Sequence, residues 1–172
     1  MSIFYNYSFS PCDSFVMKLF INLKFKTMVT VDLKNMELNE LMAKEDSKQH
    51  CKATFPLLGA HGTSKIATVY FELEPGDNIG RHTDNAEEML FILEGKVSAS
   101  IGDETAELNA GNLALVPTMI PHDVKNTGET TAKVLGVFGG VNHIVASFDH
   151  GWLPEGEKVV STAVMFEEAQ TS

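Results

Sequence analysis

Residues 76–95 read GDNIGRHTDNAEEMLFILEG, and residues 111–126 read GNLALVPTMIPHDVKN. Short apolar runs separated by Gly and Pro turns, as in both stretches, are typical of the strands of a β-barrel. Two histidines and two carboxylates stand among these runs: His82, Asp84, Glu88 and His122. A barrel that turned these four side chains inward would place them around one cation. The two stretches therefore predict a metal site more clearly than they predict a substrate.

Segments with strand character continue along most of the chain. They are short, β-branched or aromatic, and most are bounded by Gly, Pro, Asn or Asp. We expect strands over residues 53–58, 65–73, 87–93, 96–101, 105–108, 113–116, 122–126, 133–138 and 143–148. Because so many strands follow one another without helices between them, the pattern favours an all-β antiparallel sandwich or barrel.

The segments on either side of these strands have a different pattern of apolar and polar residues. Met36, Leu38, Leu41 and Met42 recur at roughly helical spacing, so we expect a short amphipathic helix over residues 34–48. The tail from Asp149 should be an ordered loop that runs to a final strand or helix. The expected organisation is an N-terminal extension (1–28), a helical lead-in (29–51), the barrel (52–148) and a C-terminal tail (149–172).

Residues 1–28 are rich in Phe and Tyr, and charged residues and Pro11 interrupt their apolar stretches. These interruptions make the segment a poor signal peptide and prevent it from spanning a bilayer. Three readings stay open: an added edge strand, a flexible aromatic arm, or an upstream extension with translation starting at Met17 or Met28. We favour the extension, because regular patterning begins only after it.

The net charge indicates which binding partners are unfavourable, and the cysteines indicate the cellular location. A formal net charge of −10 argues against binding to nucleic acid or to an anionic membrane surface. Cys12 and Cys51 have no CxxC spacing, so we expect reduced thiols in a cytoplasmic protein. Cys51 should be a core residue or an exposed thiol, and neither reading makes it a nucleophile.

Spacing predicts how the four polar side chains meet. His82 and Asp84 are one residue apart, so on a strand they point the same way. Glu88 shares a strand face with Leu90 and Ile92, and we expect a hairpin turn at residues 85–86 to return it toward His82. The turn between Pro117 and Pro121 should aim His122 at the same point.

Imidazole and carboxylate ligands suit Fe(II), Mn(II), Ni(II) and Zn(II). Two carboxylates make the site harder, which favours Fe or Mn as the one divalent ion.

The two stretches resemble the motifs of the cupin superfamily, specifically its small single-domain bacterial members. The first motif, G-x5-H-x-H-x3-4-E-x6-G, is matched by Gly76, His82, Glu88 and Gly95. The second, G-x5-P-x-G-x2-H-x3-N, is matched by Gly111, Pro117, His122 and Asn126. The resemblance covers about residues 52–147 and implies a jelly-roll barrel, an antiparallel double-stranded β-helix.

Two positions depart from the family pattern. Asp84 stands where the family usually has a second histidine. It is a fourth ligand or a base beside the metal, or its shorter side chain leaves the metal with three ligands or abolishes binding. Met119 stands where the second motif usually has Gly, and Met adopts a positive φ poorly.

The resemblance implies several possible functions, because such proteins include dioxygenases, isomerases, lyases, decarboxylases and non-catalytic binding proteins. Our first hypothesis is a dioxygenase-like enzyme that acts on a small organic molecule, with Glu88 and Asp84 as catalytic carboxylates. The alternatives are a non-catalytic binding or sensing module and a metal-free sugar isomerase.

Residues 87–93 are apolar on both strand faces. Leu90 and Ile92 should face the barrel core, which leaves Met89, Phe91 and Leu93 in need of cover. We therefore expect a homodimer.

Overall fold

The structure, a computed structural model, describes residues 28–164. The expectations for residues 1–27 and for residues 165–172 lie outside the described part. No helix among the described residues has the length and apolar character needed to cross a membrane.

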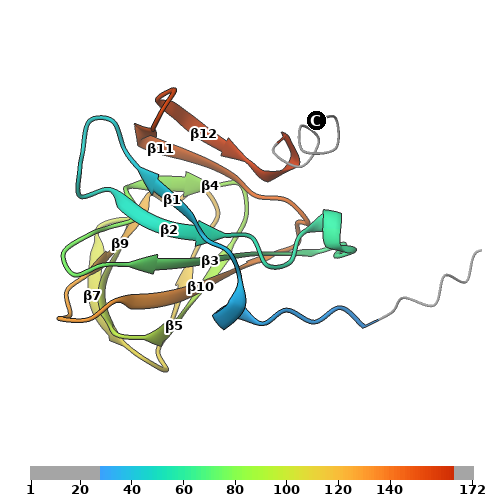
Figure 1. Ribbon diagram of the computed structural model, residues 1–172, viewed down its shortest axis with the longest axis horizontal. Coiled ribbons are helices and arrows are strands. Elements are labelled where there is room, and N and C mark those ends of the chain that lie inside the picture. The colour runs from blue at the N-terminus through green and yellow to red at the C-terminus, as the bar shows by residue number, and fades with distance from the viewer. Residues whose placement is uncertain (1–27, 165–172) are drawn as a thin grey trace, which may run out of the picture. The chain divides into compact units, whose positions relative to one another are not determined.

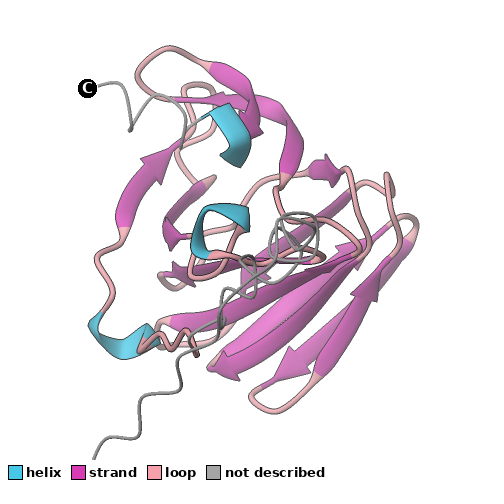
Figure 2. Ribbon diagram, turned by 90° about the vertical axis from the view of Figure 1, so that its right-hand side faces the viewer, coloured by secondary structure: helices cyan, strands magenta, loops and turns pink. Residues whose placement is uncertain are grey.

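Two six-stranded antiparallel sheets form the fold, which confirms the all-β jelly-roll (Figures 1 and 2). The first sheet contains, in spatial order, β1 (Asn39–Met42), β2 (His50–Thr54), β3 (Ile66–Leu73), β10 (Ala132–Gly139), β5 (Glu88–Glu94) and β8 (Leu113–Val116). The second contains β12 (Glu157–Ser161), β11 (Val145–Trp152), β4 (His82–Asp84), β9 (His122–Asn126), β6 (Lys96–Ile101) and β7 (Glu104–Asn109). Two 3-10 turns, η2 (Leu33–Asn35) and η3 (Gly59–His61), precede β1 and β3.

Strand β5 shows how alternation builds the interior. Leu90 and Ile92 are buried in the core beside Val134, and Glu88 shares their face. Met89, which points to the other side, is 38% exposed. The predicted inward face of this strand is therefore confirmed.

The expected hairpin at residues 85–86 is wrong. Strand β4 pairs with β11 and β9 in the second sheet, whereas β5 pairs with β10 and β8 in the first. The intervening segment therefore crosses between sheets. Asn85 fixes this crossing, because its backbone N–H donates to the carbonyl of Val145 and its side-chain oxygen accepts from the Val145 N–H. Glu88 consequently faces β4 across the barrel.

The expected helix over residues 34–48 is also wrong. After η2 the chain becomes extended and forms β1, which pairs with β2 from Asn39 opposite Ala53 to Met42 opposite His50. Within it Leu41 packs against the core, and Met42 is exposed. The segment is extended and not helical, because pairing with β2 satisfies its backbone hydrogen bonds, whereas a short helix without packing partners is marginal in water.

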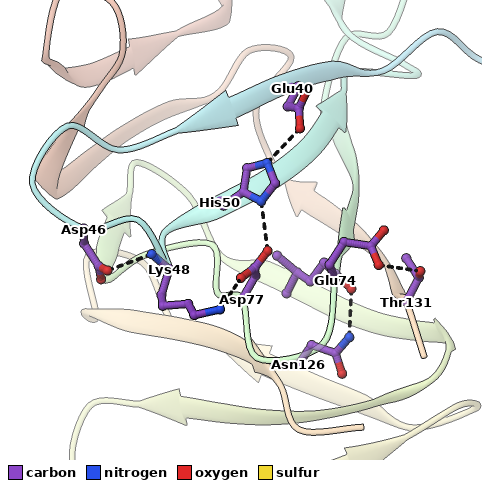
Figure 3. A network of polar contacts seen from close by, with 9 residues as sticks. Glu40, Asp46, Lys48, His50, Glu74, Asp77, Asn126 and Thr131 are labelled. Carbon is purple, nitrogen blue, oxygen red and sulfur yellow. Dashed lines mark hydrogen bonds and ion pairs between the residues drawn. The ribbon is translucent and has the colours of Figure 1, made fainter. Parts of the chain in front are cut away.

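A polar network ties this hairpin to the turn after β3 (Figure 3). His50 lies between two carboxylates, with its Nδ1 2.9 Å from Asp77 and its Nε2 3.0 Å from Glu40. The Lys48 ammonium also lies 3.3 Å from Asp77, whose side chain is largely buried. This network holds β1 and β2 against the end of the barrel.

Candidate metal centre

Both sheets contribute to one cluster of polar side chains inside the barrel. His82 and Asp84 come from β4, and His122 stands directly opposite His82 on β9. Glu88 enters from the first residue of β5, in the other sheet. All four residues are at most 7% exposed.

Asp84 lies at the centre of the cluster. Its Oδ2 is 3.5 Å from His82 Nε2 and 3.3 Å from His122 Nε2. Glu88 Oε2 is 3.4 Å from His122 Nε2. Ligand atoms of His82, Asp84 and His122 all lie within 4.8 Å of one another, a spacing that could hold a metal ion. Glu88 stands beside this group of three, next to His122.

Backbone carbonyls orient both imidazoles. His82 Nδ1 lies 2.6 Å from the carbonyl oxygen of Gly80, and His122 Nδ1 lies 3.0 Å from that of Ile120. A carbonyl oxygen only accepts, so each Nδ1 carries a hydrogen and donates. In a neutral ring this leaves the lone pair on Nε2, the atom that faces the carboxylates. Metal-binding histidines are commonly fixed in this way.

Burial and neighbouring charge set the protonation of the pair. Burial, with the nearby His122 ring, lowers the pKa of His82 to about 4, so its imidazole is neutral at pH 7. Burial lowers the pKa of His122 as well, but the Asp84 and Glu88 carboxylates outweigh burial and raise it to about 10. Burial also raises the pKa of Glu88. The two carboxylates therefore attract positive charge to His122 Nε2.

The cluster fits a divalent transition metal. Ligand atoms about 2.1 Å from one ion lie about 3.0–3.4 Å apart at octahedral or tetrahedral angles, close to the spacings around Asp84. Moreover, Asp84 Oδ2 and His122 Nε2 are buried and have no hydrogen-bond partner. Buried polar atoms are normally satisfied, so two such atoms close to each other fit a cation held between them. His82, Asp84 and His122 would hold it, and Glu88 lies beside them, 3.4 Å from His122 Nε2.

Gly136 makes room for the Glu88 carboxylate. It lies on β10, next to β5, and a Cβ added there would overlap Glu88 Oε1. Glycine weakens a strand interior, since it has no side chain to pack. At this position glycine is needed all the same, because a side chain would collide with the Glu88 carboxylate inside the barrel.

The cluster sits in a cavity of about 70 Å³ with a mostly hydrophobic lining. Phe148 stacks on the His82 ring, with centroids 4.5 Å apart and planes 19° apart. Trp152 meets Phe148 edge to face at 5.1 Å. These two aromatic residues form the wall behind His82.

Other polar side chains of the two motifs lie outside the cluster. Glu87 and Arg81 are exposed. Asn126 binds backbone, because its Nδ2 donates to the carbonyls of Leu73 and Thr130 at 2.8 Å each. Cys51 is a buried free thiol in the core, where burial raises its pKa to about 12.

Sequence reasoning missed the aromatic wall. Phe148 ended a predicted strand, but Trp152 was placed in the tail, because nothing in its flanking sequence marked it as barrel. Strand β11 runs four residues further than predicted and pairs with β4, which carries His82 and Asp84. The apolar and aromatic character of residues 143–152 was the available signal.

Comparison with known proteins agrees with this architecture. The sequence profile of the cupin domain family matches residues 69–138. A comparison with curated protein sequences finds no match.

Solved structures give the fold similarity. A predicted oxalate decarboxylase from Thermotoga maritima is 20% identical with a TM-score of 0.58, over 66% of this chain and 100% of that one. The polyketide cyclase RemF from Streptomyces resistomycificus is 21% identical with a TM-score of 0.54, over 66% and 80%. Oxalate decarboxylase from Bacillus subtilis, a protein with Mn(II) centres, is 20% identical with a TM-score of 0.53, over 63% of this chain and 30% of that one.

Proposed function

The chain contains a domain of the cupin family, and on that premise we propose that it is a metal-dependent, dioxygenase-like enzyme that acts on a small organic molecule. Fe or Mn is the proposed ion, because two carboxylates beside two imidazoles form a hard donor set. The proposed location is the cytoplasm, where a free thiol such as that of Cys51 persists.

The proposal assigns a task to each side chain. His82, Asp84 and His122 hold the ion, and the carbonyls of Gly80 and Ile120 keep the imidazoles oriented. Bound there, the ion supplies Lewis-acid polarisation of substrate oxygen atoms and a site for O2. Glu88, 3.4 Å from His122, either completes the donor set or takes a proton from a substrate hydroxyl.

One observation carries the proposal: Asp84 Oδ2 and His122 Nε2 are buried, face each other at 3.3 Å and have no hydrogen-bond partner. A buried carboxylate and imidazole that form no hydrogen bond through these atoms cost stability. A divalent ion between them would remove that cost.

The test is oxygen consumption by the full chain. Protein reconstituted with Fe(II) or Mn(II) is mixed with candidate phenols and diketones in an oxygen-electrode cell. We expect substrate-dependent O2 uptake from the loaded wild type and none from metal-free protein or His122→Ala. Uptake that is equal with and without metal would contradict the proposed enzyme.

A binding or sensing module is the second candidate. The observation that favours it is the lining of the cavity, which offers no acid or base among the described residues apart from the four clustered side chains. If the loaded protein binds its ligand stoichiometrically and releases it unchanged, this candidate replaces the enzyme. The metal-free sugar isomerase has less support, because a sugar would find no hydroxyl or amide partner on the described lining.

A further inference from the structure

The cavity around the candidate metal centre has two chemically distinct parts. Its polar part consists of His82, Asp84, Glu88 and His122, and the described lining adds the indole N–H of Trp152, which is buried without a hydrogen-bond partner. The rest of the described lining is hydrophobic, with aromatic rings contributed by Phe55, Phe71, Phe138, Phe148 and Trp152. No Lys, Arg, Ser, Thr, Asn, Gln or Tyr of the described chain lines it.

We propose that this cavity selects an uncharged, largely hydrocarbon molecule with a flat ring and with its oxygen atoms at one end, such as a simple phenol. The inference rests on the proposed function, since it names the substrate class of the same site. It also separates this protein from enzymes that act on small dianions or on sugar phosphates.

Charge excludes anions from the body of the cavity. Asp84 and Glu88 already place carboxylates in the buried cluster, and Arg81, the cation nearest in sequence to His82, is exposed. A metal ion would compensate one anionic group at the polar end. A second anionic group of the same molecule would then lie among aromatic rings without a partner, which burial penalises strongly.

Hydrogen bonding excludes sugars in the same way. A hydroxyl that leaves water needs a partner in the protein. Beyond the four clustered side chains, the described lining offers aliphatic and aromatic groups, the thiol of Cys51, which is a weak donor and acceptor, and one full donor, the buried indole N–H of Trp152, which has no hydrogen-bond partner. A polyol would therefore lose several hydrogen bonds on entry, whereas a hydrocarbon body loses none.

Ring geometry favours a flat molecule. Phe148 stacks on His82, and Trp152 meets Phe148 edge to face, so aromatic surfaces stand next to a proposed metal ligand. Aromatic pairs prefer such offset or edge-on contacts. A phenol whose oxygen reaches the polar end would bring its ring against this wall.

Binding can be measured directly on the full chain. Isothermal titration calorimetry compares 4-methylphenol with oxalate and ribose 5-phosphate, on metal-free and Mn(II)-loaded protein. Trp152 is the only tryptophan in the sequence, so its fluorescence reports the cavity independently. We expect both forms to bind 4-methylphenol at least tenfold more tightly than either anion. Equal or tighter binding of an anion, or no binding of 4-methylphenol, would overturn the proposal.

A matched pair of variants on β12 locates the selectivity. Val160 lines the cavity, whereas its neighbour Val159 is 54% exposed. Val160→Lys should weaken 4-methylphenol at least tenfold and strengthen oxalate, because it adds a cation to the lining. Val159→Lys should change neither affinity. If Val160→Lys fails to fold, the affinities of Val160→Thr and the selectivity of the wild type still test the proposal.

The two proposals fail separately. If the chain binds no metal but keeps the preference for 4-methylphenol, the proposed enzyme is wrong and the ligand class stands. If the chain binds metal but prefers an anion, the metal centre stands and the ligand class is wrong.

Discussion

Asp84 is the residue whose role the structure changes most. Its identity departs from the family pattern, which made its place in the cluster doubtful from sequence. In the structure its Oδ2 lies within 3.5 Å of both imidazoles, whereas the ion-pair distance of Glu88 is to His122. The one-residue spacing from His82 explains this, since both side chains leave the same face of β4.

We therefore expect Asp84→Ala to weaken metal binding more than Glu88→Ala does. The Kd for the metal should rise at least tenfold, because the Asp84 carboxylate lies next to the Nε2 atoms of both histidines. Competition against a metallochromic chelator with Mn(II) measures it, and Glu87→Ala, an exposed neighbour, is the control. A larger loss for Glu88→Ala would make Glu88 the principal carboxylate.

Met119 is the second departure from the pattern, and it carries strain. Its φ of 62° lies in the left-handed region, although its side chain is 59% exposed and contributes little packing. Its N–H donates to the Asp84 carbonyl at 3.0 Å, so the turn supports the strand of the metal centre.

Met119→Gly should raise the free energy of unfolding. The substitution removes the left-handed penalty of about 1–2 kcal/mol from the folded state. The greater conformational freedom of Gly in the unfolded chain offsets part of this, which leaves a net gain of about 0.5–1 kcal/mol. Urea denaturation measures it. Met119→Ala keeps a Cβ and should gain nothing, and a gain equal to that of the Gly variant would show that the backbone is not the cause.

At the scale of elements, the sequence predicted most strands because alternation and turn residues act locally. Residues 113–116 and 122–126 match β8 and β9, and residues 96–101 match β6. The lead-in could not be assigned in this way. Leu41 fits a helical face and a strand face equally well, and its state depends on pairing with β2, a contact that no local pattern encodes.

The same reasoning applies to the site. Inward-facing positions followed from period two, so the convergence of the four side chains was predictable. The path between Asp84 and Glu88 was not, because a turn and a crossing between sheets use the same short polar segment. Strand pairing with β11 decides between them.

The network around His50 makes the β1–β2 hairpin sensitive to pH. Its hydrogen bond with Asp77, together with Glu40, raises the pKa of His50 above 6.5 despite burial. A raised pKa in the folded state means that the charged ring stabilises folding below about pH 6.5. That contribution is lost as pH rises through the folded-state value.

His50→Gln should therefore destabilise the protein more at pH 6 than at pH 9, with a difference of up to about 1 kcal/mol for a partly exposed pair. Urea denaturation at the two pH values measures it. His150→Gln, in an exposed residue, is the control. A His50→Gln cost that grows with pH would reverse the assigned sign.

At the scale of the molecule, the outer face of the first sheet is apolar at its edge. Strand β8 is an edge strand, where Leu113 and Leu115 are 57% and 58% exposed. They stand opposite Phe91 and Met89 of β5. Such a patch beside an unpaired edge suits a second copy of the same chain related by a two-fold axis.

We predict a homodimer that persists without residues 1–27. Light scattering after size exclusion compares the full chain, a chain starting at Met28, and Leu113→Lys/Leu115→Lys. Both wild-type chains should be dimers and the double variant a monomer. Two monomeric wild-type chains would refute the dimer, and a monomeric full chain with a dimeric short one would assign the patch to residues 1–27.

The central claim is that the cluster of His82, Asp84 and His122 holds one divalent ion. Elemental analysis of purified protein, after exposure to Fe(II) or Mn(II) and desalting, tests it most directly. Wild type should retain about one ion per chain, His122→Ala less, and His82→Ala/His122→Ala close to none, since the double variant keeps only carboxylates. Circular dichroism should show that the double variant keeps its strands. Full occupancy in that folded double variant would contradict the account.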